Sequence, residues 1–199
     1  MPSLPQAGTA LFLKRWLRRP FAIGAVVPSG RWLADAMARA TLASLGRRGG
    51  AVIELGAGTG EVTRALLANG LPAERLVLVE RDPELAHFLR RHFVGPRIVE
   101  GDAARLPRLL VEQGVGQVDG VVSSLPLLSL PPAVVRDIVN GVFEVMPPEG
   151  ALVQFTYGPK PPVPAGLRER LSLVAGHGPR IWRNVPPAMV WTFRRRADA

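Results

Sequence analysis

The sequence predicts a doubly wound α/β domain, in which helices cover both faces of a mostly parallel sheet. Three observations predict it. Short apolar runs alternate with amphipathic stretches between residues 51 and 157, as in repeated β-α units. Glycine, proline, asparagine or aspartate separates these segments. After residue 180 the alternation gives way to two apolar runs that flank residues 185–188, which indicates a closing antiparallel pair.

The composition fits one compact domain. The chain has 199 residues, of which 47% are hydrophobic, enough for a sizeable core. It has no cysteine, which excludes disulfides, thiolate metal sites and thiol catalysis. Prolines and serines interrupt the longest uncharged apolar stretch, residues 120–135, so we expect no transmembrane span. The basic cluster near the start follows the first apolar residues instead of preceding them, which is not the order of a signal peptide.

The positive charge belongs to the two ends of the chain. Residues 1–50 carry a net charge of +7 and residues 160–199 carry +6, whereas residues 51–159 carry −4. Basic ends beside an acidic centre favour an anionic partner, either lipid headgroups or nucleic acid. The alternative is a bias in nucleotide composition, because 23 of the 25 basic residues are arginine.

Residues 1–46 are expected to form an N-terminal helical extension, and residues 47–199 the main domain. An amphipathic helix is expected from Thr9 to Arg19, before Pro20. Its apolar arc holds Phe12, Leu13, Trp16 and Leu17, and its opposite arc holds Lys14, Arg15, Arg18 and Arg19. This pattern is typical of an interfacial helix on anionic lipid, and the alternative is a helix packed on the core. A second helix is expected after Ser29, a suitable N-cap, up to Leu42.

The main domain should begin its alternation at once. Buried strands are expected at residues 51–55, 76–80, 97–100, 118–123 and 151–157. Helices are expected at residues 61–68, after the N-cap Asp82, at residues 103–112 and after the pair Pro131 and Pro132. The closing pair is expected to consist of Arg180–Asn184 and Met189–Phe193.

A glycine-rich loop follows the first strand. Its sequence, Glu54-Leu55-Gly56-Ala57-Gly58-Thr59-Gly60, allows a tight turn and a close approach of backbone to a ligand. A dinucleotide fingerprint would need its third glycine one position later, where Glu61 stands. A pyrophosphate would also lie poorly beside the two acids, Glu54 and Glu61. The loop therefore favours a ligand without a pyrophosphate.

The spacing acid-x-Gly-x-Gly-x-Gly resembles the first motif of class I methyltransferases. The resemblance implies a seven-stranded, Rossmann-like sheet and S-adenosylmethionine as cofactor, with S-adenosylhomocysteine as product and no metal. It places the cofactor on the loop residues Gly56, Ala57, Gly58, Thr59 and Gly60. It also implies that Glu54 faces the ammonium end of the cofactor.

Two further acids stand where the next two strands are expected to end. Glu80 lies 22 residues beyond Gly58, where a carboxylate can accept from both ribose hydroxyls. Asp102 matches the family acid that accepts from the adenine amino group. The cofactor site implied by the resemblance also takes in Arg81, Ala103 and Ser124.

The fourth expected strand leads into Ser123-Ser124-Leu125-Pro126-Leu127. Methyltransferases that act on the amino groups of nucleic-acid bases place Asn or Asp, Pro and an aromatic residue here. The polar residue holds the amine and the ring stacks on the base. Because Ser124 and Leu127 occupy those places, we expect no nucleic-acid partner.

Three stretches together resemble bacterial phospholipid N-methyltransferases: residues 24–29, residues 124–129 and residues 154–158. This group is similar to ribosomal RNA adenine dimethyltransferases. The resemblance implies methylation of phosphatidylethanolamine through its mono- and dimethyl forms to phosphatidylcholine. It also implies a cytoplasmic enzyme held peripherally on the inner face of the membrane. Lipid surface and substrate are expected to meet Phe12, Lys14, Arg15, Trp16, Arg18, Arg19 and Ser29.

The chemistry would be an in-line displacement at a sulfonium methyl group by a neutral amine. No strong general base is evident in the sequence. Tyr157, the one tyrosine, is a candidate catalytic residue that could orient the amine or a phosphate, or else a packing residue. Two other functions remain open: an RNA or DNA adenine N6-methyltransferase, and a non-catalytic membrane-binding protein that retains the fold.

Overall fold

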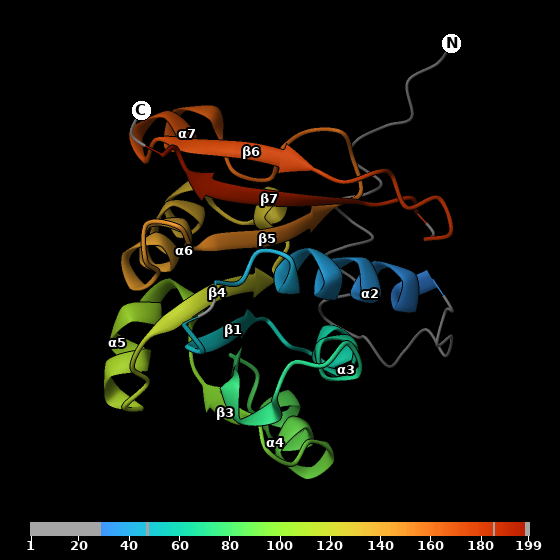
Figure 1. The fold of residues 1–199 in the computed structure, drawn as a ribbon, viewed down its shortest axis with the longest axis vertical. Coiled ribbons are helices and arrows are strands. Elements are labelled where there is room, and N and C mark those ends of the chain that lie inside the picture. Colours follow the sequence, from blue (N-terminus) through green and yellow to red (C-terminus); the bar gives the residue numbers. More distant parts are fainter. Residues whose placement is uncertain (1–28, 47, 185, 198–199) are drawn as a thin grey trace.

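The structure is a computed structural model that describes residues 29–46, 48–184 and 186–197. Seven strands form one sheet in the order β3-β2-β1-β4-β5-β7-β6 (Figure 1). The strands are β1 (Ala51–Leu55), β2 (Leu76–Glu80), β3 (Arg97–Glu100), β4 (Val118–Ser123), β5 (Ala151–Thr156), β6 (Leu173–His177) and β7 (Met189–Arg195). The helices are α2 (Ser29–Leu42), α3 (Glu61–Ala68), α4 (Pro83–His92), α5 (Leu106–Glu112), α6 (Pro132–Val145) and α7 (Ala165–Arg170). Three short 3₁₀ turns are η1 (Ala73–Arg75), η2 (Ala103–Arg105) and η3 (Leu127–Ser129).

The first five strands run parallel, and β7 lies antiparallel between β5 and β6. The strand order reverses between β1 and β4, which are neighbours in the sheet. Open α/β sheets bind their ligands at such a switch point, beyond the carboxyl ends of the strands. The predicted fold class is confirmed, and β1 to β4 have the expected bounds.

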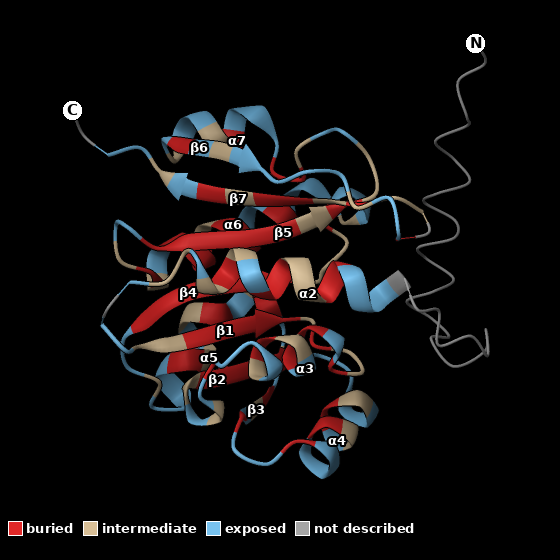
Figure 2. Ribbon diagram, turned by 45° about the vertical axis from the view of Figure 1, so that its right-hand side comes forward, coloured by how far each residue is buried: buried red, intermediate tan, exposed pale blue. Residues whose placement is uncertain are grey.

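Two apolar cores lie on the two faces of the sheet. One packs α2, α3 and α4 against it through residues such as Met37, Leu66 and Leu89. The other packs α5, α6 and α7 against it through residues such as Leu106 and Val139. Figure 2 shows the central strands buried along most of their length, with the helices exposed on their outer sides. Central parallel strands are buried on both faces, which explains their nearly continuous apolar sequences.

Helix α2 is part of the layer that covers the sheet. Its buried residues Leu33, Ala34, Met37 and Ala38 join the same core as α3. The division of the chain after residue 46 stays a prediction. The helix expected at residues 9–19 lies outside the described residues. In the described part of the chain, no helix is both long enough and apolar enough to cross a bilayer.

The prediction for the closing pair was wrong in one strand. The partner of β7 is β6, and residues 180–184 contribute only the isolated bridge between Ile181 and Ala188. Pro179 before this segment and Pro186 after it lack the amide hydrogens that a ladder needs. Gly176 interrupts the apolar pattern of β6, and α7, which precedes β6, was not predicted.

Two smaller differences have local causes. The helix expected at residues 103–112 divides into η2 and α5, because Pro107 stands in the first turn of α5 and restricts the residue before it. Strand β5 ends at Thr156, one residue before the expected end. The N-cap of α4 is as predicted, since the Asp82 carboxylate accepts from the amides of Glu84 and Leu85.

Candidate active site

The glycine loop turns sharply from β1 into α3. Gly56, Gly58 and Gly60 have φ angles of +69°, +55° and +80°. These left-handed conformations favour glycine, which has no Cβ to clash with its own carbonyl. The amide of Gly56 donates to the carbonyl of Val79 at 2.8 Å, which ties the start of the loop to β2.

Two of these glycines are also required by close packing. A Cβ on Gly60 would lie 2.4 Å from the Phe93 ring, and a Cβ on Gly56 would lie 2.6 Å from Leu125 Cδ2. A Cβ on Gly58 would meet nothing within 4 Å. The middle of the loop therefore faces open space, where a ligand can approach the backbone.

Glu54 is fully buried at the end of β1. Thr63 of α3 donates its hydroxyl to Glu54 Oε2 at 2.7 Å, while Oε1 has no hydrogen-bond partner among the described residues. Burial raises the pKa of Glu54 from an ordinary value of 4.5 to about 8. A buried, unpartnered carboxylate oxygen is costly unless a donor reaches it. The site is therefore suited to a ligand that carries a cation or an N–H group.

Glu80, the last residue of β2, connects the glycine loop after β1 with the segment after β2. Its Oε2 accepts from the amide of Gly58 at 2.9 Å, and its Oε1 accepts from the amide of Asp82 at 2.9 Å. Each carboxylate oxygen has capacity for a second hydrogen bond. Glu80 can therefore hold the glycine loop and still accept from the hydroxyls of a ligand. Its neighbour Arg81 is exposed.

Asp102 follows the end of β3, two residues after Glu100, which pairs with Glu80 of β2. Its side chain accepts from the amide of Ala104 at 3.0 Å and caps η2. The carboxylate is exposed, whereas the neighbouring Ala103 is buried. The structure thus brings the three predicted acids to the ends of three adjacent strands, and each one also organises the backbone that follows it.

The loop after β4 is fixed to both neighbouring strands. The amide of Ser124 donates to the carbonyl of Leu55 at 2.9 Å. Gln154 of β5 donates from Nε2 to the carbonyl of Leu125 at 2.9 Å. Gln154 is 1% exposed, and its Oε1 has no partner in the described part of the chain. Sequence reasoning missed this role, although an amide inside an apolar strand was the signal for it.

Tyr157 follows β5 directly and is half-buried. Its ring packs edge-on against Phe155, with the centroids 5.2 Å apart. Burial raises the pKa of Tyr157, so the phenol stays protonated and acts as a donor at neutral pH. The contacts place it beside the core under α2, and its catalytic role stays a prediction.

The donor and acceptor chemistry of these residues fits S-adenosylmethionine. This cofactor presents an ammonium group, two ribose hydroxyls and an adenine amino group, and the strand ends present acceptors at Glu54, Glu80 and Asp102. The open space at Gly58 allows backbone contact with it. A pyrophosphate would meet two buried acids instead. No cluster of three potential metal ligands occurs among the described residues.

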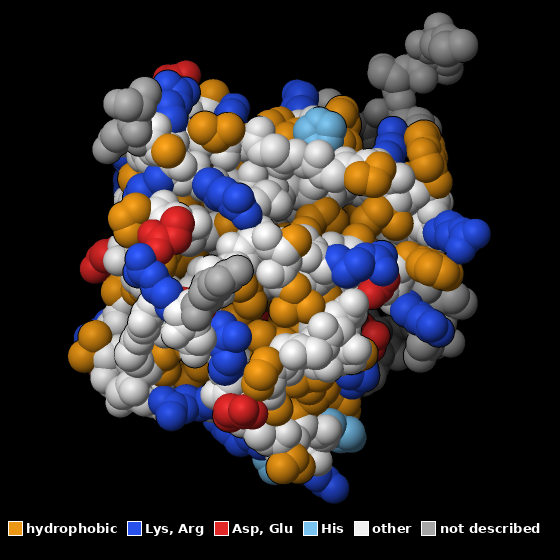
Figure 3. All heavy atoms as spheres, viewed as in Figure 1, with side chains coloured by type: hydrophobic (Ala, Val, Ile, Leu, Met, Phe, Trp, Pro, Cys, Tyr) orange, Lys and Arg blue, Asp and Glu red, His pale blue; other side chains and the backbone are white. Residues whose placement is uncertain are grey.

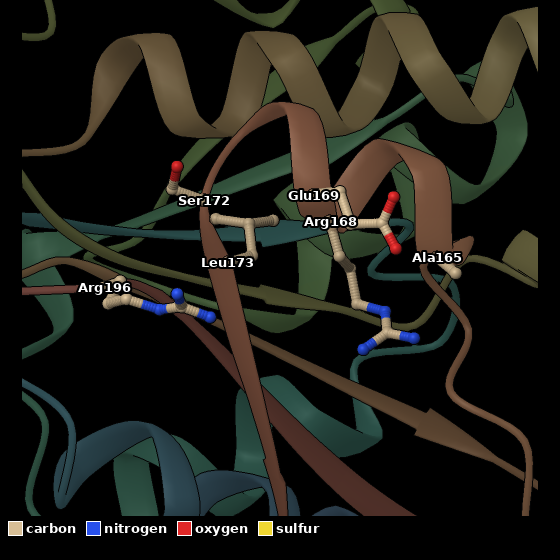
Figure 4. Close-up of a pocket in the computed structure, with 6 residues that line it drawn as sticks. All are labelled: Ala165, Arg168, Glu169, Ser172, Leu173 and Arg196. Atoms are coloured by element: carbon tan, nitrogen blue, oxygen red, sulfur yellow. The ribbon is translucent and has the colours of Figure 1, made fainter.

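The remaining predicted residues lie elsewhere. Phe12, Lys14, Arg15, Trp16, Arg18 and Arg19 are outside the described residues, and Ser29 is described only as the start of α2. A separate pocket lies at the start of β6, near the amino ends of the parallel strands and away from the glycine loop (Figure 4). Its lining is Ala165, Arg168, Glu169, Ser172, Leu173 and Arg196. None of these residues was predicted to act in the site.

Comparisons with known proteins agree with this geometry. Residues 52–150 match a family described as Methyltransferase domain. The ornithine lipid N-methyltransferase of Singulisphaera acidiphila is 36% identical over 152 residues, which cover 75% of this chain and 78% of that protein. The ribosomal RNA small subunit methyltransferase A of a Synechococcus strain is 48% identical over 68 residues, which cover 30% of this chain and 23% of that protein.

The fold also matches a solved methyltransferase. The 1,6-didemethyltoxoflavin-N1-methyltransferase of Burkholderia thailandensis, solved with bound S-adenosylhomocysteine, superposes with a TM-score of 0.65. The match covers 99% of this chain and 93% of that one at 18% sequence identity. With its strand-end acids, its glycine loop and a relative that matches most of its length, this chain belongs to the class I S-adenosylmethionine-dependent methyltransferases.

Proposed function

We propose that this enzyme methylates the headgroup amine of a membrane lipid, with phosphatidylethanolamine and its mono- and dimethyl forms as substrates and phosphatidylcholine as the final product. The observation that carries the proposal is the position of Leu127. It is 3% exposed and belongs to the core beneath the sheet. The place where base-methylating enzymes carry a stacking ring is therefore occupied by a buried aliphatic side chain.

The relatives support the same substrate class. The ornithine lipid N-methyltransferase matches three quarters of this chain, whereas the ribosomal RNA methyltransferase matches 30% of it. An ornithine lipid also carries a primary amine on a lipid headgroup, so it is the second candidate substrate. Both candidates need a site that receives an amine without stacking on a base.

The chain's own residues can position such an amine. Leu125 O already accepts from Gln154 Nε2 and from the amide of Leu127, each at 2.9 Å. A carbonyl oxygen has two lone pairs, so these two bonds use its capacity. The half-buried hydroxyl of Ser124, beside the glycine loop, is then the polar side chain that this loop offers to an amine.

The amine must be neutral to react. A primary alkylamine with a pKa of about 10 is neutral in roughly one molecule in a thousand at pH 7. Leu125 and Pro126 give the loop an apolar surface, and desolvation against it lowers the pKa of the amine. When bound, S-adenosylmethionine supplies an electrophilic methyl group on a sulfonium. Glu54 and Glu80 would hold the cofactor, and Gln154 fixes the loop after β4, which would receive the amine.

We also propose that the enzyme is cytoplasmic and associates peripherally with the inner face of the membrane. Residues 9–19 combine an apolar arc with four cations, which suits an anionic lipid surface. The chain's net charge of +9 acts in the same direction.

Transfer of a radiolabelled methyl group tests the function. The full chain is incubated with labelled S-adenosylmethionine and, separately, with detergent-dispersed phosphatidylethanolamine, with an ornithine lipid and with ribosomal RNA. We expect label on phosphatidylethanolamine and none on RNA, and Glu80→Ala should abolish it. Label on the ornithine lipid alone would keep the lipid class and change the substrate. Label on RNA alone would overturn the proposal.

A further inference from the structure

Two tryptophans on different elements lie exposed on the same side of the molecule. Trp32, in the first turn of α2, is 40% exposed, and Trp182, between β6 and β7, is 70% exposed. Both line one groove with a volume of about 580 Å³, together with apolar residues that include Ala36, Ile181 and Val190. Exposed tryptophans are uncommon on a surface that meets only water, and they are frequent at binding surfaces.

Arginines accompany these rings. The guanidinium of Arg180 lies 4.6 Å from the centroid of the Trp182 ring, and that of Arg183 lies 4.8 Å from the centroid of the Trp32 ring. We call the arginine–tryptophan surface the set Trp32, Arg39, Arg180, Trp182 and Arg183. Cations held over aromatic faces keep their charge at the surface while the rings stay available to apolar contact.

The surface is strongly positive. Among the described residues, its one ion pair joins Arg39 to Asp35 at 2.7 Å. Arg180 and Arg183 are exposed, and neither has a carboxylate within 4.0 Å among the residues that the structure describes. A second copy of this chain would present the same positive charge, so a symmetric contact between two such surfaces would be repulsive. Charge complementarity favours an anionic occupant.

The surface lies at the catalytic edge of the sheet. Met189, the first residue of β7, pairs with Thr156 at the carboxyl end of β5, so the segment before β7 stands beside the ends of the parallel strands. Figures 1 and 2 both place the first turn of α2 at that same end. In Figure 3, basic and hydrophobic side chains are interspersed over the outer end of α2 and the segment that precedes β7.

We propose that the arginine–tryptophan surface docks on an anionic lipid bilayer. Docking would hold the edge of the sheet at the carboxyl ends of the parallel strands against the bilayer. Tryptophan prefers the interface between headgroups and acyl chains, and arginines bind anionic headgroups. The inference rests on the proposed function for its purpose, since it would bring the site to a lipid amine. It assigns membrane contact to α2 and to the segment between β6 and β7, in addition to the contact proposed for residues 9–19.

Flotation of the full chain with vesicles tests the surface. The vesicles contain phosphatidylcholine with or without phosphatidylglycerol. We expect binding only with phosphatidylglycerol, and a loss of at least about a hundredfold in the partition coefficient for Arg180→Glu/Arg183→Glu. Trp182→Ser should also weaken binding. The matched control Arg91→Glu/Arg194→Glu makes the same charge change on exposed arginines of α4 and of the far end of β7, and should retain at least a tenth of the parent's binding.

Each outcome is decisive for the surface. Thermal unfolding near the parent's temperature shows that the variants are folded. Parent-like flotation of Arg180→Glu/Arg183→Glu would overturn the proposal, and so would an equal loss in the control pair. Oligomers of the parent that Trp182→Ser dissolves, with unchanged flotation, would reassign the surface to self-association. If vesicles bind as expected but no aminolipid is methylated in detergent, the proposed function fails and the docking surface stands.

Discussion

Glu80 Oε2 accepts a 2.9 Å hydrogen bond from the amide of Gly58, so an acid at the end of β2 holds the loop that follows β1. The same carboxylate accepts from the amide of Asp82 through Oε1. A single side chain thus fixes the backbone at two adjacent strand ends. Its role in the site is to shape the loop as well as to accept from a ligand.

Replacing Glu80 with alanine should therefore abolish cofactor binding. The variant loses the carboxylate that is expected to accept from the two ribose hydroxyls of the cofactor. Each of these hydrogen bonds to a charged acceptor is worth about 1.5–3 kcal/mol, so the affinity should fall by at least about a hundredfold. Calorimetric titration with S-adenosylmethionine measures it. Glu84→Ala removes an exposed acid from the first turn of α4 and should bind like the parent. Near-normal affinity in Glu80→Ala would contradict the assignment.

Cofactor affinity should rise with pH between about pH 6 and pH 8, because Glu54 is buried and its pKa is raised to about 8. Below that pH the empty site binds a proton that the cofactor's ammonium group, with a pKa of about 7.7–8.0, must displace. The rise should not exceed about tenfold per pH unit. Titrations across this range should show it in the parent, and a flat, weaker profile in Glu54→Gln.

The same residue gives the empty enzyme a pH-dependent stability. Between the ordinary pKa of 4.5 and the raised value of about 8, Glu54 holds a proton in the folded state that it has lost in the unfolded state. Stability therefore falls as pH rises through this window. Denaturant unfolding of the cofactor-free protein should show the fall, and Glu54→Gln should reduce it. A parent-like slope in Glu54→Gln would contradict the burial effect.

A methyl group at Gly60 should destabilise the fold more than one at Gly58. Both glycines have positive φ, so alanine costs about 1–2 kcal/mol in backbone strain at either position. Only at Gly60 would the new Cβ collide with Phe93. We expect an added loss of roughly 1–3 kcal/mol there, measured by denaturant unfolding. Phe93→Leu should restore part of the loss in Gly60→Ala, and equal losses at both glycines would argue against the clash.

An ion pair between the buried Asp119 and the half-buried Arg75 lies near the amino ends of β1 and β4. Asp119 Oδ2 accepts from the amide of Gly50 at 2.8 Å and from Arg75 Nη2 at 3.0 Å. Asp119→Ala should lower the free energy of unfolding by roughly 2–4 kcal/mol, because it leaves these donors unpaired. Cofactor affinity should not change. Asp137→Ala removes an exposed pair with Arg136 and should cost less than about 1 kcal/mol. Similar losses in the two variants would contradict the structural role.

Residues 9–19 should contribute to membrane binding in their own right. Each cation adds roughly 1 kcal/mol near an anionic surface, and salt screens this attraction. We expect reversible, salt-sensitive cosedimentation with anionic vesicles that is lost in Trp16→Glu and in Arg15→Ala/Arg18→Ala/Arg19→Ala. Cofactor titration provides the control, since these variants should bind S-adenosylmethionine normally. Variants that pellet like the parent would leave this segment without a role in membrane binding.

The sequence by itself determined the elements whose signals are local. Strands β1 to β4 were located by apolar runs that a two-faced core requires, and α4 by its cap at Asp82. The positions of Glu54, Glu80 and Asp102 followed from strand ends, because parallel strands bring their carboxyl ends to one edge. These features depend on neighbours within a few residues along the chain.

The tertiary structure decided what depends on contacts between distant segments. It chose β6 over residues 180–184 as the partner of β7, since strand pairing rewards a continuous ladder that no local pattern reports. It brought Gln154 to the carbonyl of Leu125 and placed Trp182 in the same groove as Trp32. Such contacts join residues far apart in sequence, and only the packing of the whole sheet with its helices sets their distances.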